Sequence, residues 1–160
     1  MTHDSYKDEL TEALQLCEIH NERMQYGYHK LMHYFPLNTK RYKELSKDDL
    51  SYFDQLIFPF SKLQDSMGNR LFPALLKNLG EDIRGLPFID LLTTLEKLQL
   101  LDDHKQWFQL RETRNTVTHE YPFISDEVIE GLNALSEDAI VISDIWNSLK
   151  TYCRERFNIQ

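Results

Sequence analysis

Apolar residues recur at three- and four-residue steps along nearly the whole chain, the period of amphipathic helices that bury one face. The first stripe predicts a helix from Ser5 to Phe35, which Pro36 ends because proline has no amide donor for the helical ladder. A polar connector is expected from Leu37 to Leu45. The N-terminal part is thus predicted to be one long helix followed by a loop.

The second helix has a recognisable start. Ser46 and Asp49 have the spacing of a capping box, with Asp in place of the usual Glu or Gln. The apolar stripe that begins there continues to Leu79 or Gly80. A second long helix is therefore expected between these limits.

Three helix-disturbing residues fall inside this second helix: Pro59, Gly68 and Pro73. A proline in a helix interior removes one hydrogen bond and clashes with the preceding turn. We expect bends at the two prolines or a break near Gly68. The sequence leaves open what these departures do for the molecule.

The rest of the chain predicts three further helices. They are a short helix over about 88–100, a third long helix from a cap at Asp102 or Asp103 to about Glu120, and a last long helix after a cap at Ser125 or Asp126. Pro122 ends the third long helix, because the residue before a proline is pushed out of the α region.

Together these elements predict an all-α fold. Four long amphipathic helices, one extra short helix and no convincing strand favour an antiparallel four-helix bundle with up-and-down topology. The chain has no internal repeat, low-complexity tract or flexible linker, and 160 residues suit one core. A single helical domain over residues 1–160 is expected.

Charge limits the range of functions. The formal net charge of -8 repels nucleic acid and anionic membranes, which argues against a broad nucleic-acid coat protein. It does not argue against an enzyme that captures one or two phosphates through a local basic patch. No run approaches the roughly 18 apolar residues of a membrane span, so a soluble, cytoplasmic protein is expected.

The two cysteines, Cys17 and Cys153, are too few and too far apart for a disulfide framework or a zinc cluster. Both fall inside apolar helical patterns. Buried free thiols in a reducing compartment are therefore predicted.

The segment 110–122 concentrates polar chemistry at the end of the third long helix. On a helical wheel Arg111, Asn115 and His119 form one ladder, and Arg114 flanks it about 140° away from His119. The face carries few acids to pair with its bases. A solvated helix face is the ordinary interpretation of such a pattern, but the shortage of acids and the histidine near the helix end favour a site.

This segment also carries a family resemblance. Arg114-Asn115-x-x-x-His119 resembles the Arg-polar-x-x-x-His signature of HEPN domains. With Tyr121 two residues after the histidine, and with the flanking residues 110–112 and Pro122, it is similar to the HEPN toxin of bacterial toxin–antitoxin pairs whose antitoxin is a minimal nucleotidyltransferase.

The resemblance implies a metal-independent endoribonuclease that acts at a dimer cleft, with no cofactor and with RNA as its substrate. His119 would serve as general base or acid and Arg114 would bind phosphate oxygens. Asn115 would orient the imidazole or the substrate, and Arg111 would add a second phosphate contact. Because Arg114 and His119 project in different directions, a homodimer is expected to complete the site.

Tyr121 matches the tyrosine that, in that family, accepts AMP groups from the partner nucleotidyltransferase. Phosphate-bearing groups beside Arg114 and His119 would compete with RNA phosphates. A half-buried packing role beside Pro122 is the equally weighted alternative. The partners implied are therefore a second copy of the chain and a cognate minimal nucleotidyltransferase antitoxin.

Two other functions stay open. Relatives of this fold resemble non-catalytic partner subunits that help a minimal nucleotidyltransferase to bind its substrate or nucleotide. The bundle could also serve assembly alone. A metal site is not expected: His29 and His33 have a possible zinc spacing but no third ligand, and the paired acids such as Asp102 and Asp103 are interpreted as caps.

Overall fold

The computed structural model describes residues 3–119 and 123–159, and for His3 and His119 only the backbone. Its helices are α1 (His3–Leu31), α2 (Thr39–Lys43), α3 (Lys47–Ser66), α4 (Phe72–Asn78), α5 (Phe88–Lys97), α6 (His104–His119) and α7 (Asp126–Phe157), with a 3-10 turn at Met32–Tyr34 and a π-helical segment at Met67–Leu71. No strand occurs in these described ranges. The predicted all-helical class is confirmed.

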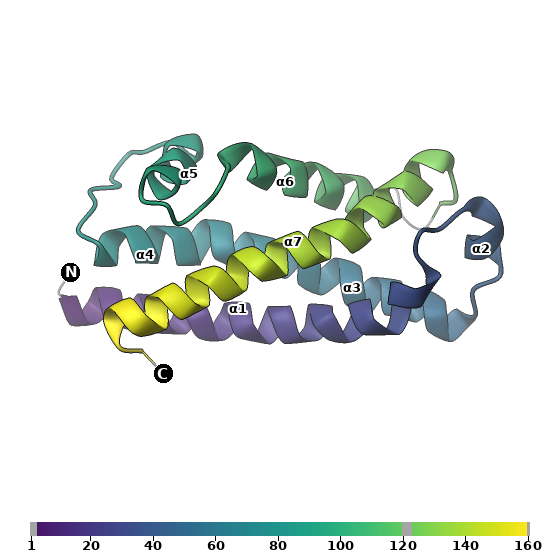
Figure 1. Ribbon diagram of the computed structural model, residues 1–160, viewed down its shortest axis with the longest axis horizontal. Coiled ribbons are helices and arrows are strands. Elements are labelled where there is room, and N and C mark those ends of the chain that lie inside the picture. Colours follow the sequence, from purple (N-terminus) through teal and green to yellow (C-terminus); the bar gives the residue numbers. More distant parts are fainter. Residues whose placement is uncertain (1–2, 120–122, 160) are drawn as a thin grey trace.

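The long helices lie side by side as a bundle. In Figure 1, α1 and α3 run next to one another, α7 crosses in front of them, and α6 lies along the opposite side. The short helices α2 and α5 are at opposite ends of the molecule. This places the end of α6 in the half of the bundle that contains α2 and the start of α3.

Large side chains from several helices fill one core. The fully buried aromatic residues are Phe53, Phe60, Phe72, Trp107 and Trp146. Such packing supplies most of the stability of an amphipathic bundle, because helices in proteins are stabilised mainly by burying their apolar faces and less by intrinsic propensity.

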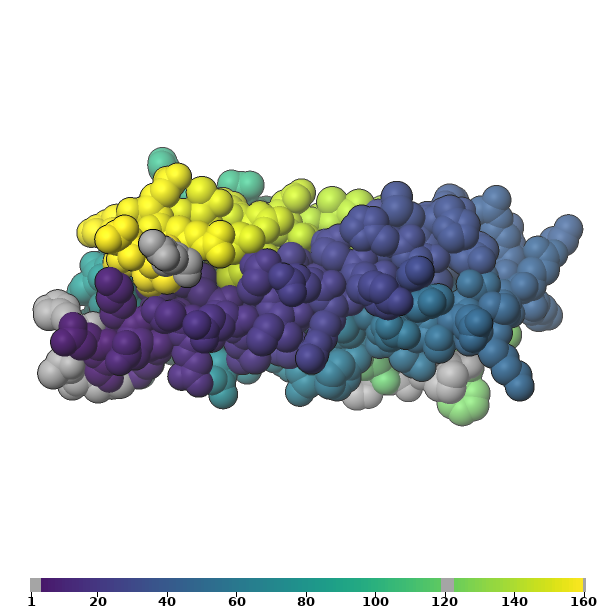
Figure 2. Space-filling view, turned by 90° about the horizontal axis from the view of Figure 1, so that it is seen from below, coloured from purple at the N-terminus to yellow at the C-terminus, as the bar shows by residue number. Residues whose placement is uncertain are grey.

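One polar cluster ties α7 to α1. The indole of Trp146 donates a hydrogen bond of 3.1 Å to Glu18, and the ammonium group of Lys150 contacts the same carboxylate oxygen at 3.0 Å. Figure 2 shows the C-terminal part of α7 in yellow beside the N-terminal half of α1 in purple. The thiols of Cys17 and Cys153 are buried and free in this region, as predicted.

The segment after α1 is more ordered than the expected connector. α1 ends at Leu31, and the short helix α2 follows, capped by Asn38, whose side chain accepts a hydrogen bond of 2.8 Å from the amide of Arg41. Tyr42 on α2 is only 7% exposed. A buried aromatic and a side-chain cap are sufficient to stabilise a single helical turn that periodicity alone does not reveal.

The predicted start of the second helix is confirmed. Ser46 and Asp49 form a reciprocal capping box, with hydrogen bonds of 3.1 and 3.2 Å. The hydroxyl of Tyr34 donates to the same Asp49 carboxylate at 2.9 Å, which connects this cap to the segment that follows α1.

The second predicted helix changes its hydrogen-bond pattern near Gly68 but does not break there, because Ser66, Met67, Leu71 and Phe72 all keep right-handed helical backbone. α3 continues through Pro59, and the π-helical segment containing Gly68 separates α3 from α4. Pro73 lies in the first turn of α4, where its missing amide leaves little unsatisfied.

None of the described helices is both long enough and apolar enough to cross a membrane.

Candidate functional site

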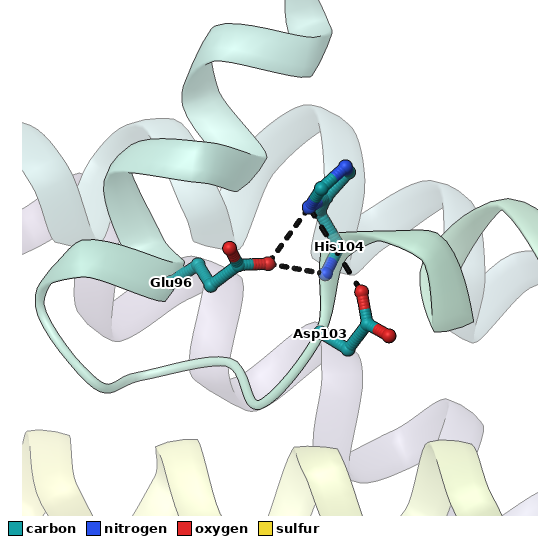
Figure 3. Close-up of side chains that lie close together, drawn as sticks. All are labelled: Glu96, Asp103 and His104. Carbon is teal, nitrogen blue, oxygen red and sulfur yellow. Dashed lines mark hydrogen bonds and ion pairs between the residues drawn. The ribbon is translucent and has the colours of Figure 1, made fainter.

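The start of α6 is fixed by a polar clamp, shown in Figure 3. The carboxylate of Glu96 accepts hydrogen bonds from both the amide and Nδ1 of His104, each at 2.7 Å. Asp103 accepts a bond of 2.9 Å from the amide of Lys105, so it caps the helix as predicted. Glu96, Asp103 and His104 are the one close cluster of three potential metal ligands in the described part, but helix capping already accounts for these bonds.

The predicted orientation of α6 is confirmed. Leu110 and Val117 are 1% and 0% exposed and face the core, whereas Arg111 and Asn115 are exposed. The helix is continuous from His104 to His119. Arg114 and His119 are therefore about 140° apart around its axis, as the sequence implies.

Arg114 is held by a residue that sequence reasoning missed. Its Nη1 and Nη2 donate to the two carboxylate oxygens of Asp65 on α3, at 2.6 and 3.1 Å. The two side chains are 30% and 36% exposed. A guanidinium has five N–H donors, so three remain for another acceptor, but the pair is electrically neutral as a unit.

Arg111 lies against α5. The centre of its guanidinium lies 5.4 Å from the ring centroid of Phe88, a cation–π distance. Arg111 and Arg114 thus project from neighbouring turns of α6 toward different neighbours, α5 and α3. They border the same hollow.

We call this hollow the arginine pocket; it has a volume of about 220 Å³ and is lined by Gln64, Asp65, Gly68, Asn69, Phe88, Trp107, Arg111 and Arg114. Gln64, Gly68 and Trp107 are the buried part of its lining, whereas Asn69 and Arg111 are exposed at its mouth. The π-helical segment supplies one wall. Single π turns within α-helices are frequent at functional sites.

Gln64, which lines the pocket, has an unpaired side-chain amide. Gln64 is 3% exposed, and neither its Nε2 nor its Oε1 has a hydrogen-bond partner in the described part of the chain. Buried polar atoms are nearly always paired, because leaving them unpaired is costly. The amide is therefore a feature that needs an explanation.

The structure brings together only part of the predicted site. Arg111 and Arg114 line one pocket, and Asn115 is exposed on the adjoining face. His119 is the last residue of α6, but its side chain lies outside the described residues, as does all of Tyr121. The contacts of these two side chains are accordingly not part of the observed geometry.

Of the eight lining residues only Arg111 and Arg114 were predicted as site residues, and three of the others are instructive. Asp65 gives no signal in the sequence, because an acid on an exposed helix face is ordinary. Gln64 could have been noticed as a polar residue in the apolar stripe of the second helix. Phe88 reads only as an apolar residue at the start of a short helix.

The other candidates have structural roles. Nδ1 of His29 lies 2.7 Å from the carbonyl oxygen of Gln25, and the ring of His33 lies against that of Tyr34. Tyr26 on α1 packs edge-on against Tyr52 on α3, with the ring centroids 6.2 Å apart.

A larger groove of about 620 Å³ lies between α1 and α3 and includes Tyr26, Phe58 and Pro59 in its lining. Its lining is mainly apolar, and Tyr26 and Phe58 are 53% and 60% exposed. It contains neither an unpaired buried polar group nor the arginines of α6. We therefore place the chemistry at the smaller arginine pocket.

No protein-family model, curated protein or solved structure matches the chain. The motif at the end of α6 and the geometry around it are therefore what indicates a function.

Proposed function

We propose that this protein is a HEPN-type toxin of a toxin–antitoxin system, a metal-independent endoribonuclease that acts as a homodimer. Its four long helical units, α1, α3 with α4, α6 and α7, would form the antiparallel up-and-down bundle of that family. The observation that carries the proposal is the position of the Arg114-Asn115-x-x-x-His119 string on the last turns of α6, with Arg114 fixed by Asp65 beside a pocket.

In this proposal the RNA supplies its own nucleophile. The 2′-oxygen attacks the adjacent phosphorus, and the bond from phosphorus to the 5′-oxygen of the next nucleotide breaks. One His119 accepts the proton of the 2′-hydroxyl, and a protonated His119 donates one to the departing 5′-oxygen. The products are a 2′,3′-cyclic phosphate and a 5′-hydroxyl end.

Arg114 would bind the phosphoryl oxygens with the N–H groups that Asp65 does not use. The carboxylate of Asp65 fixes the plane of the guanidinium, which orients those remaining donors. Arg111, exposed at the mouth of the arginine pocket, would contact a neighbouring phosphate.

A second copy of the chain is part of the mechanism. Arg114 and His119 are five residues apart on one helix and project about 140° apart, so a two-fold axis near the end of α6 would bring two copies of each around one groove. Large apolar side chains support an interface there. Phe123 and Ile124, which follow α6, are 77% and 47% exposed.

The proposed antitoxin is a cognate minimal nucleotidyltransferase that adds AMP to Tyr121 or covers the site. Each added phosphate would compete with RNA for Arg114 and Arg111. Mass spectrometry of the chain after co-expression with such an enzyme tests this step. A mass shift on Tyr121 is expected, and an unmodified Tyr121 in a neutralised complex would leave occlusion as the mechanism.

One observation favours a second function, a non-catalytic nucleotide-binding partner subunit of a minimal nucleotidyltransferase. The bidentate pair with Asp65 lowers the net charge that Arg114 offers to RNA. In that case the face would hold a nucleotide phosphate without cleaving any bond.

Cleavage assays separate the two functions. The wild-type protein should cleave RNA and be toxic when expressed, and His119→Ala should lose both properties while keeping its helical content. Arg114→Lys should also lose activity, because an ammonium group cannot reproduce the planar fork. Absence of cleavage by the wild type, with AMP binding retained, would reject the ribonuclease and support the subunit. A fully active monomer in sedimentation experiments would contradict the shared site.

A further inference from the structure

The arginine pocket contains a feature that phosphate binding does not use. Gln64 lines this pocket, and both of its amide atoms are buried without a partner among the described residues. A glutamine side chain offers one acceptor oxygen and two donor hydrogens, side by side. The complement of such a group is a ligand edge that presents a donor next to an acceptor, as nucleobases do.

Two aromatic side chains also line this pocket. Phe88 and Trp107 both line the pocket, and the guanidinium of Arg111 lies 5.4 Å from the Phe88 ring centroid. Aromatic rings and guanidinium planes are the surfaces on which proteins stack single-stranded bases. The lining of the pocket thus combines a hydrogen-bonding side chain with surfaces on which a base can stack.

Phosphate-binding groups are at the rim of the same pocket. Arg114 keeps three N–H donors beyond those bonded to Asp65, and Arg111 is exposed at the mouth. A volume of about 220 Å³ is below the range of roughly 300–1,000 Å³ for drug-sized ligands. The size fits one ring system with its phosphate outside.

We infer that the arginine pocket binds one nucleotide unit, with the edge of its base on Gln64 and its phosphate against Arg111 and Arg114. The inference rests on the proposed function for the source of that unit. A nucleotide of an RNA strand would be the occupant in the ribonuclease, and a free nucleotide in the partner subunit.

Access to Gln64 requires a small movement of the wall. Its amide atoms are closed to water, whereas Asn69 and Arg111 are exposed side chains at the mouth. Gly68 leaves space beside the aromatic residues of the pocket. A Cβ added at Gly68 would lie 3.4 Å from Cζ of Phe88 and 3.7 Å from Cζ2 of Trp107.

The decisive variant is Gln64→Met, which keeps the length of the side chain but removes both polar atoms. Ser61→Ala is the matched control, because Ser61 is also buried with an unpaired oxygen but does not line the pocket. Both variants should be at least as thermally stable as the wild type, since each removes an unpaired buried group. Only Gln64→Met should change nucleotide binding.

Binding is measured by calorimetric titration with adenosine 5′-monophosphate, uridine 5′-monophosphate and ribose 5-phosphate, which lacks a base. The wild type should bind at least one of the two nucleotides about tenfold more tightly than ribose 5-phosphate. Gln64→Met should lose this preference and bind ribose 5-phosphate as before, and Ser61→Ala should behave as the wild type. Equal affinities for all three ligands in the wild type, or an unchanged preference in Gln64→Met, would overturn the inference.

A second variant fills the pocket instead of changing its polarity. Gly68→Ala should fold normally, because its Cβ would make ordinary contacts, and should weaken nucleotide binding through the narrowed space. Unchanged nucleotide binding in Gly68→Ala would also contradict the inference. Cleavage of RNA by the same proteins gives the separate readout: a base preference that depends on Gln64 without any cleavage rejects the ribonuclease but keeps the pocket. Cleavage without such a preference rejects the pocket but keeps the ribonuclease.

Discussion

Asp65 on α3 holds the guanidinium of Arg114 on α6 through two hydrogen bonds, 2.6 Å from Nη1 to Oδ1 and 3.1 Å from Nη2 to Oδ2. The pair fixes the direction of the arginine but cancels its charge. These two effects have opposite consequences for phosphate binding, and they can be measured separately.

Replacing Asp65 by Asn should raise the affinity for RNA and lower the rate of cleavage. The positive charge of Arg114 is then uncompensated, but the planar fork is no longer oriented by two charged acceptors. The salt dependence of RNA binding should become steeper, because one more cation contributes to counterion release. Fluorescence anisotropy at several salt concentrations, together with cleavage kinetics, measures both effects.

Asp82→Asn is the matched control for that experiment. Asp82 forms a similar bidentate pair with Arg84, but both residues are exposed on the connection between α4 and α5. It should change neither the cleavage rate nor the salt slope by a comparable amount. Similar effects from both variants would mean that net charge, and not the orientation of Arg114, is responsible.

Gly27→Ala should destabilise the contact between α1 and α3. Pro59 cannot donate to the carbonyl of Gln55, and a Cβ at position 27 would lie 2.7 Å from that oxygen and 2.9 Å from the amide nitrogen of Leu56. Such overpacking costs about 1–3 kcal/mol, partly offset by about 1 kcal/mol of helix propensity. Urea unfolding measures the loss. Gly68→Ala, which has room, should show none, and equal losses would contradict the explanation.

Gly131→Ala should loosen the crossing of α6 and α7. A Cβ there would lie 2.8 Å from Cγ2 of Thr116, whose hydroxyl donates to the carbonyl of Glu112 at 3.1 Å. Adding Thr116→Ser removes the clashing methyl group and keeps the hydroxyl, so the double variant should recover stability. A double-mutant cycle by thermal unfolding should therefore show strong coupling, and additive losses would exclude this contact as the cause.

Asp138→Asn should increase stability at neutral pH. Burial raises the pKa of the Asp138 carboxyl above its usual 3.8, although the carboxylate accepts a hydrogen bond of 2.5 Å from Thr113. The folded state therefore binds this proton more tightly than the unfolded state, so the free energy of unfolding falls as pH rises from 3.8 through the raised pKa. The amide of Asn can still accept from Thr113 without a charge. Unfolding titrations across this range should show a smaller decrease for the variant, and parallel curves would contradict the assignment.

The two cysteines should not react with thiol reagents in the native protein. Burial raises the pKa of both Cys17 and Cys153 to about 12, so almost no thiolate is present at neutral pH. Labelling should become complete when urea unfolds the chain. Rapid labelling of either residue in the folded protein would show that the end of α7 opens away from α1.

Several local features were predicted because their causes are local. The capping box at Ser46 and Asp49 depends on residues three positions apart. The irregular, π-helical turn at Gly68 lies where the sequence contains residues that disturb any helix. The short helix α2 was missed, because the burial of Tyr42 that stabilises it depends on the rest of the molecule.

The candidate site divides in the same way. The sequence by itself determined the all-helical class, the buried side of α6 at Leu110 and Val117, and the angle between Arg114 and His119, since these follow from the period of one helix. Only the tertiary structure decided that Asp65 neutralises Arg114, that Arg111 lies over Phe88, and that Gln64 lines the same pocket with its amide buried and unpaired. These contacts join α3, α5 and α6 across long separations in sequence, and the packing of the bundle, which no local pattern encodes, brings them together.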